Sequence, residues 1–226
     1  MRVPFRLVDV FCERPLEGNQ LCVVPETPGL DDASMQALAR EIGFSETTFV
    51  TEARGDRYAM RIFTPAAELP FAGHPTLGTA FVLVSEGRVS PAVTQVVAAG
   101  EIPVEVDVVA GRARMRQLPP TFGEPVEDRA TVAAAIGLTP DELHPELPPQ
   151  MVSTGLAHLL VAVRDLGALR RAHAVVAPAR EVARAQDATG LYAFALTEEG
   201  ATARLFDVDH GVGEDPATGA GRSAAW

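Results

Sequence analysis

Lysine is absent from this chain of 226 residues, and all nineteen of its basic residues are arginine. The chain therefore has no amine side chain for the Schiff base of pyridoxal phosphate enzymes, and none for the lysine of a nucleotide-binding P-loop. Thirty acidic residues outnumber the basic ones and leave a net charge of −11. This charge argues against a surface that binds nucleic acid or an anionic membrane.

Cysteine is scarce as well, with Cys12 and Cys22 only. Their spacing indicates neither a disulfide framework nor a zinc site, and the five histidines show no ligand spacing, so we expect no metal. A signal-peptide pattern and a long apolar span are also missing. With 47% hydrophobic residues the chain can bury a core, as one large domain or two small ones. We expect a soluble cytoplasmic protein.

Hydrophobic periodicity and turn residues predict a mixture of strands and helices. Strands are expected at Val3–Phe11, Gln20–Val24, Ser45–Thr51, Tyr58–Thr64, Val93–Ala98, Ile102–Val109, Ala113–Gln117, Met151–Ser153, Leu159–Val163, Leu191–Thr197 and Ala203–Val208. Helices are expected from a cap at Asp31 or Asp32 to a stop at Gly43, at Pro75–Glu86, at Val132–Ile136 and within Asp165–Ala185. The proline-rich stretch Leu118–Pro125 is the best candidate linker, and it divides the chain into lobes 1–117 and 118–226.

A faint internal repeat links the two lobes. Arg61-Ile-Phe-Thr is followed by His74-Pro-Thr-Leu-Gly78, and Arg204-Leu-Phe-Asp is followed by Asp215-Pro-Ala-Thr-Gly219. A helix, a glycine and an apolar strand precede each pair. The repeat predicts two similar lobes, each offering a helix N-terminus to a shared cleft.

The predicted helix starts have a chemical use, because a helix N-terminus offers unpaired N–H groups and a partial positive charge to a substrate carboxylate. The same field disfavours imidazolium, so His74 is expected to be neutral. The competing interpretation of His74 and Asp215 is that each is a plain helix cap. Glu46, among apolar neighbours, is either an exposed edge residue or a buried carboxyl that moves protons, and spacing alone favours the edge residue.

Several of these blocks resemble the PhzF-like phenazine-biosynthesis isomerase family. They are Asp9-Val-Phe11 with Gly18-Asn19-Gln20, Gly43-Phe-Ser-Glu46-Thr-Thr-Phe49, Arg61-Ile-Phe-Thr-Pro65, Glu68-Leu-Pro-Phe-Ala-Gly-His74-Pro-Thr-Leu-Gly78, and Gly213-Glu-Asp215-Pro-Ala-Thr-Gly219. The resemblance is collinear over nearly the whole chain. The Glu46 and His74 blocks are its specific part.

The resemblance implies a diaminopimelate-epimerase-like α+β fold, with two similar lobes that each wrap a β-barrel-like sheet around a central helix. It implies a cofactor-independent isomerase, of the type that acts on trans-2,3-dihydro-3-hydroxyanthranilate, and a homodimer. It assigns the catalytic roles to Glu46, which moves the proton, and to His74 and Asp215. Binding of a small carboxylate substrate falls to Asn19, Gln20, Ser45, Gly73, Thr218, Gly219 and Ala220.

Two departures from the family pattern stand out. Ala220 occupies the position where the family usually has a serine, so one hydroxyl group is missing. By the repeat, the chain ends within the central helix of the second lobe, so we expect that lobe to be truncated. A truncated lobe is expected to leave apolar surface open around Leu191–Val208 and to favour oligomers.

Other functions fit the sequence less well than this interpretation. Racemases of the same fold use two opposed cysteines, but His74 and Thr218 stand in the two motifs here. A phosphate site at Gly211–Gly219 lacks a lysine and contains two acids. The remaining alternative is a non-catalytic relative that binds a small carboxylate or forms oligomers.

Overall fold

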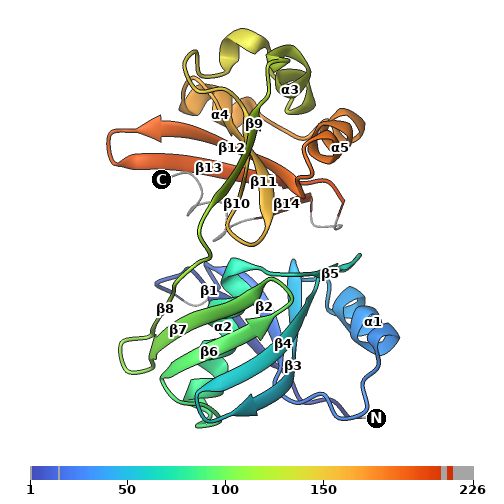
Figure 1. The fold of residues 1–226 in the computed structure, drawn as a ribbon, viewed down its shortest axis with the longest axis vertical. Coiled ribbons are helices and arrows are strands. Elements are labelled where there is room, and N and C mark those ends of the chain that lie inside the picture. Colours follow the sequence, from blue (N-terminus) through green and yellow to red (C-terminus); the bar gives the residue numbers. More distant parts are fainter. Residues whose placement is uncertain (1, 15, 210–212, 216–226) are drawn as a thin grey trace. The chain divides into compact units, whose positions relative to one another are not determined.

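The computed structural model describes residues 2–14, 16–209 and 213–215. The chain divides into two compact units, Met1–Leu118 (unit 1) and Pro119–Trp226 (unit 2). Strands and helices are mixed in both units (Figure 1), which confirms the predicted α+β class.

Unit 1 is a curled sheet with two helices. Its described elements are β1 (Arg6–Val10), β2 (Asn19–Val24), α1 (Asp32–Ile42), β3 (Glu46–Arg54), β4 (Arg57–Phe63), β5 (Glu68–Leu69), α2 (Gly73–Ser85), β6 (Ala92–Val97), β7 (Gly100–Asp107) and β8 (Arg112–Met115). The strand order is β1-β2-β3-β4-β6-β7-β8, and β5 pairs with β4. The pairs β2–β3 and β4–β6 are parallel, because α1 and α2 respectively cross over between their strands.

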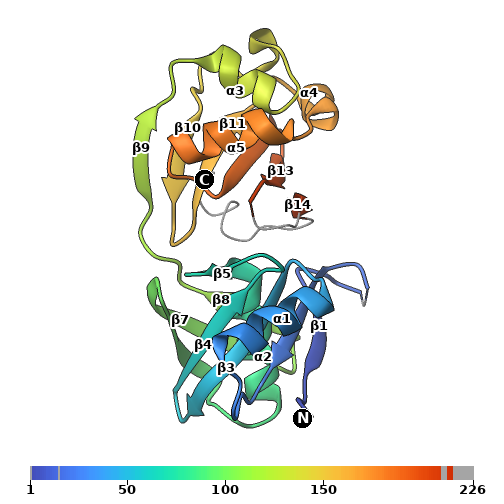
Figure 2. The same cartoon turned by 90° about the vertical axis from the view of Figure 1, so that its right-hand side faces the viewer.

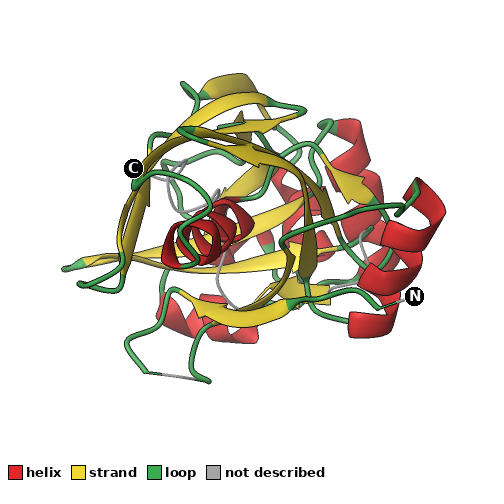
Figure 3. Ribbon diagram, turned by 90° about the horizontal axis from the view of Figure 1, so that it is seen from below, coloured by secondary structure: helices red, strands yellow, loops and turns green. Residues whose placement is uncertain are grey.

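Helix α2 lies inside the curl of this sheet (Figure 3) and contacts β1, β2, β3, β6, β7 and β8. Its sequence GHPTLGTAFVLVS contains no acidic or lysine/arginine side chain, as expected for a helix that is buried on most sides. The predicted central helix is confirmed for unit 1, although it begins at Gly73 and not at Pro75.

Helix α1 covers the opposite face of the sheet. Its N-cap is Asp31, whose side chain accepts a hydrogen bond from the backbone N–H of Ser34, and its C-cap is Gly43 with φ of 72°. Both ends lie where the capping signals predict. The buried residues between α1 and the sheet are Cys22, Val24, Met35, Ala39, Phe49 and Phe63.

Unit 2 is a second sheet with helices on one face. Its described elements are β9 (Thr121–Pro125), α3 (Arg129–Ala135), the 3₁₀ turn Pro140–Glu142, β10 (Gln150–Ser153), β11 (Ala157–Ala162), α4 (Leu166–Arg171), α5 (Val176–Ala185), β12 (Gly190–Thr197), β13 (Gly200–Asp207) and β14 (Gly213–Asp215). The strand order is β14-β13-β12-β11-β10-β9. Among the described strand pairs of this second sheet, only β11 and β12 are parallel.

Alternating residues of this sheet form two apolar layers. One layer packs with α3, α4 and α5, and Figure 2 shows α5 lying against the sheet. The other layer consists of Val152, Leu160, Ala162, Tyr192, Phe194 and Leu205, each less than a tenth exposed. The prediction of an open apolar surface around Leu191–Val208 is therefore wrong, because the apolar side chains of both layers in this region are mostly buried.

Two other expectations about unit 2 need correction. The predicted linker Leu118–Pro125 contains strand β9, whose residues pair with β10, so its prolines do not prevent an edge strand. The predicted helical region Asp165–Ala185 is two helices, separated at residues 172–175. Within the described residues, no helix combines the length and the apolar character needed to cross a membrane.

The two units repeat one arrangement of strands. In each, an antiparallel pair (β1–β2, β10–β11) leads through a helical crossover to a parallel neighbour (β3, β12), which continues into an antiparallel strand (β4, β13). The arginines of the sequence repeat also correspond, since Arg61 lies over the ring of Phe63 and Arg204 over that of Phe206, at 5.0 Å each. The faint sequence repeat thus corresponds to a structural one.

Candidate active site

Three element starts meet in unit 1 and bring polar side chains together. Asn19 begins β2, Glu46 begins β3, and His74 lies in the first turn of α2. Strands β2 and β3 are parallel, with Leu21 opposite Glu46, so both strands begin at the same end of the sheet. Residues far apart in the sequence are therefore neighbours here.

Glu46 is not the exposed edge residue that its spacing suggested. Strand β3 lies between β2 and β4 in the sheet, and the Glu46 side chain is only 12% exposed. A carboxyl group at this depth needs partners, because transfer of a charge away from water is costly. Its Oε2 atom lies 3.6 Å from Nε2 of His74.

His74 is not a helix cap either. The N-cap of α2 is Ala72, which has no capping side chain, and the His74 ring is 3% exposed. Burial lowers the pKa of His74 to about 3, and a hydrogen bond to the backbone of Gln20 opposes this shift without reversing it. The imidazole is therefore neutral near pH 7, as its place at a helix start predicts.

The distance between Glu46 and His74 would allow an ion pair, whereas the lowered pKa of the imidazole argues against a charged pair. Burial decides the question, because an almost fully enclosed imidazolium loses its hydration. We therefore describe a neutral imidazole beside a carboxyl group. The distance of 3.6 Å between Glu46 Oε2 and His74 Nε2 is longer than a hydrogen bond, and a small movement of either side chain would form one.

Asn19 connects His74 to Ser45. Its Nδ2 atom lies 3.3 Å from Nδ1 of His74, and its Oδ1 atom accepts a hydrogen bond of 3.2 Å from the Ser45 hydroxyl. Asn19 is 1% exposed. The resemblance assigns Asn19 only to substrate binding, so its contact with His74 is a feature that the sequence did not indicate.

The other predicted site residues are spread over both units. Gly73 is the first residue of α2 and is buried, while Gln20 is exposed on β2. Asp215 is the last residue of strand β14, opposite Leu205, and is partly buried. Thr218, Gly219 and Ala220, with the predicted second central helix, lie outside the described residues.

The start of α2 can receive an anion. No side chain caps it, and no acidic residue lies in its first turn. The backbone N–H groups of Gly73 and His74 belong to the unpaired first turn, whereas Pro75 has none to offer. A substrate carboxylate placed there would lie beside Glu46 and His74. Within the described residues, no group of three or more His, Cys, Asp or Glu side chains is arranged to hold a metal ion.

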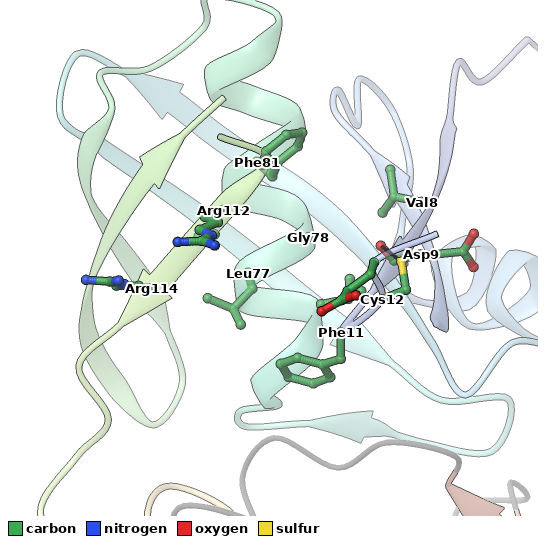
Figure 4. A pocket seen from close by; sticks show the side chains of 13 residues that line it. Val8, Asp9, Phe11, Cys12, Leu77, Gly78, Phe81, Arg112 and Arg114 are labelled. Atoms are coloured by element: carbon green, nitrogen blue, oxygen red, sulfur yellow. Dashed lines mark hydrogen bonds between the residues drawn. The ribbon is translucent and has the colours of Figure 1, made fainter. Parts of the chain in front are cut away.

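A separate pocket of about 400 Å³ lies between the two edge strands of the unit 1 sheet (Figure 4). Leu77, Gly78 and Phe81 of α2 form its floor, and residues 8–13 and 111–114 form its walls. Neither Glu46 nor His74 belongs to this lining. The pocket is therefore distinct from the acid–base pair.

Comparison with known proteins identifies the family and several relatives of this chain. The model of the family described as phenazine biosynthesis-like protein matches residues 8–225. The uncharacterized isomerase YddE of Salmonella typhimurium is 32% identical over 232 residues, which cover 97% of this chain and 77% of that protein. Trans-2,3-dihydro-3-hydroxyanthranilate isomerase of Pseudomonas aeruginosa is 33% identical over 217 residues, with coverages of 94% and 74%.

A solved structure shows the same fold. It is that of a predicted epimerase from Pseudomonas aeruginosa, which is 34% identical and superimposes with a TM-score of 0.85. The superposition covers 99% of this chain and 80% of that one. Sequence and fold therefore point to the same group of proteins.

Proposed function

The chain belongs to the phenazine biosynthesis-like protein family, and from this premise we propose that it is an isomerase that moves a proton within a small unsaturated carboxylic acid. The observation that carries the proposal is the Glu46–His74 contact of 3.6 Å at the uncapped start of α2. No other reactant is needed, because the proton that leaves one carbon returns at another.

Glu46 is the proton carrier in this proposal. Its carboxylate takes a proton from one carbon of the substrate, the electron pair is delocalised over the adjacent double bonds, and the proton is delivered to a second carbon. A side chain that both accepts and returns the proton must touch the reacting carbons and be shielded from water. Glu46, 12% exposed beside a neutral imidazole, meets the second condition.

His74 and the backbone at Gly73 are proposed to hold the substrate. The first turn of α2 attracts a carboxylate through its N–H groups and the helix dipole. Such an anchor would place the carbons next to the carboxylate within reach of Glu46. This favours an unsaturated ring acid similar to trans-2,3-dihydro-3-hydroxyanthranilate, the compound in the name of the Pseudomonas aeruginosa relative.

The remaining assignments rest on the resemblance alone. Asp215 is proposed as a third catalytic residue that orients a polar group of the substrate. Gln20, Thr218, Gly219 and Ala220 are proposed to contact the substrate, and the protein is proposed to work as a homodimer without a cofactor.

The test of the proton carrier is the substitution Glu46→Gln. Glutamine keeps the shape and hydrogen bonding but cannot carry the proton, so we expect the rate to fall by at least about 10³-fold while ligand binding persists. Ring-proton migration in trans-2,3-dihydro-3-hydroxyanthranilate, followed by NMR in D₂O, measures the rate. Glu52→Gln, an exposed position of the same strand, serves as the matched control.

The turnover of wild type, Glu46→Gln and Glu52→Gln distinguishes three conclusions about Glu46 and the protein. Loss of turnover in Glu46→Gln, with normal rates in Glu52→Gln, supports the assignment. Normal turnover in Glu46→Gln excludes Glu46 as the proton carrier. A wild-type chain that binds the acid without converting it supports the second candidate, a non-catalytic carboxylate-binding protein, which Ala220 favours because the usual serine hydroxyl is missing.

A further inference from the structure

Asn19 is buried in a place where its amide group can control the ring of His74. It is the only asparagine of the chain, and it is 1% exposed. Its two polar atoms face different partners, Nδ1 of His74 at 3.3 Å and the hydroxyl of Ser45 at 3.2 Å. Asn19 begins β2, at the end of the sheet where the parallel strand β3 also begins, and so lies next to Glu46 and His74.

The chemistry of the amide fixes the direction of the hydrogen bond. An amide nitrogen only donates, so Nδ1 of His74 must be the acceptor in this contact. The Ser45 hydroxyl donates to the amide oxygen, which suits the same orientation of the amide. A neutral imidazole carries one N–H, and with Nδ1 accepting, that proton is on Nε2.

The proton on Nε2 matters because of what this nitrogen faces. Oε2 of Glu46 lies 3.6 Å away, and burial keeps the imidazole neutral by lowering the pKa of His74 to about 3. With the proton on Nε2, the ring offers an N–H toward the carboxylate that must receive the substrate proton. With the proton on Nδ1, Nε2 would instead direct a lone pair at that carboxylate and repel it.

We infer that Asn19 is a positioning residue, which holds the proton of His74 on Nε2 so that the imidazole orients the carboxyl group of Glu46. Ser45 supports this role by binding the amide oxygen. The competing acceptor for the ring proton is the backbone of Gln20, which is hydrogen-bonded to the same imidazole. The kinetic consequence rests on the proposed function, but the tautomer itself does not.

The test is direct observation of the tautomer by NMR of the full chain with ¹⁵N-labelled histidine. Long-range ¹H–¹⁵N correlations distinguish a protonated ring nitrogen from a bare one, and loss of signals in His74→Gln assigns the ring. We expect Nε2 protonated and Nδ1 bare in the wild type between pH 6 and pH 8. Protonated Nδ1 in the wild type would overturn the inference.

Asn19→Asp supplies the second measurement. Its carboxylate can only accept, so the ring proton should move to Nδ1, or both nitrogens should be protonated. We expect kcat to fall by about 10²-fold. KM should rise as well, because the new carboxylate lies near the start of α2 and repels an anionic substrate, so the tautomer and not KM decides the inference. A folded Asn19→Asp protein that keeps the proton on Nε2 contradicts the inference.

His158 provides a control for this experiment, and Ser45 provides a second variant. The signals of His158 in unit 2, whose Nδ1 lies 3.2 Å from the Thr189 hydroxyl, should be unchanged in Asn19→Asp, which shows that the effect is confined to unit 1. Unchanged backbone amide signals of β2, β3 and α2 verify the fold of unit 1. If Asn19→Asp does not fold, Ser45→Ala replaces it, and we expect a mixture of the two His74 tautomers. An unchanged single tautomer in Ser45→Ala contradicts Ser45's support of Asn19. A wild type with Nε2 protonated but without turnover leaves this inference standing and rejects only the proposed function.

Discussion

The imidazole of His74 experiences two opposing influences. Near-complete burial favours the neutral ring, while a hydrogen bond to the backbone of Gln20 favours the protonated one, and burial prevails. The pKa of His74 is lowered from 6.5 to about 3. A residue with such a shift makes the stability of the fold depend on pH.

The sign of this dependence follows from proton binding. Between pH 6.5 and about pH 3 the unfolded chain binds a proton at His74 that the folded chain does not. The free energy of unfolding should therefore fall as the pH falls, by up to about 1.4 kcal/mol per pH unit from this residue. Urea unfolding at pH 7.5, 6.5 and 5.5 measures the slope, and His74→Gln should be flatter over this range.

A second group marks the lower limit of that range. Hydrogen bonds to the backbone of Thr139 and to Arg171 lower the pKa of Glu142 to about 2, so its contribution is lost only below about pH 4.5. Measurements above pH 5 therefore avoid the contribution of Glu142, and the difference between wild type and His74→Gln gives the part of the slope that belongs to His74. An identical slope in wild type and His74→Gln would show that the wild-type ring gains its proton at an ordinary pKa in the folded chain.

At the scale of elements, α2 depends on a close approach to the strands around it. Gly78 faces β1 and β2, and a Cβ atom there would lie 2.6 Å from Leu21 Cδ2 and 2.9 Å from Val10 Cγ2. Leu21 is fully buried and cannot move away freely, whereas Val10 borders the pocket of Figure 4. Glycine is needed for space here, and not for an unusual backbone angle.

Gly78→Ala should therefore destabilise the protein. Alanine improves helix propensity by about 1 kcal/mol, but overpacking of a closed core costs about 1–3 kcal/mol. We expect a net loss of about 1 kcal/mol in the free energy of unfolding, measured by denaturant titration. Ala33→Gly, an exposed position of α1, is the control for propensity alone and should cost about 1 kcal/mol. A more stable Gly78→Ala protein would show that the strands give way.

At the scale of the molecule, the duplicated arrangement offers a matched pair of arginines. Arg61 binds Glu68 and lies over Phe63, and Arg204 binds Glu214 in the same way. Arg204 also donates to two backbone carbonyls that end α4, those of Leu169 and Ala172. Arg61 instead reaches Asp32 of α1.

The two arginines should act on their own units. Arg204→Ala leaves buried carbonyl groups without their donor, so we expect about 2 kcal/mol of destabilisation, and less for Arg61→Ala, whose acceptors are exposed. Hydrogen exchange followed by mass spectrometry should rise in β12 and β13 for Arg204→Ala, and in β3 and β4 for Arg61→Ala. Equal increases in both units for either variant would contradict two separate cores.

The sequence by itself determined the local elements of this protein. Capping residues at Asp31 and Gly43, periodicity in α1 and turn residues between strands act over a few residues, so they can be recognised without the fold. It also determined the family, because Glu46 and His74 stand in specific motifs. Local signals failed where a neighbour in space decides the outcome, as in the edge strand β9 and the broken helical region before β12.

Only the tertiary structure decided how the candidate site is built. Spacing favoured an exposed Glu46, but β3 has strands on both sides, which no local pattern reveals. The amide that faces His74 belongs to a residue 55 positions away, and only the parallel pairing of β2 and β3 with α2 packed inside the curl brings the three starts together. Burial and hydrogen-bond direction, which set the charge and the tautomer of His74, arise from that packing because they depend on which groups replace water around the ring.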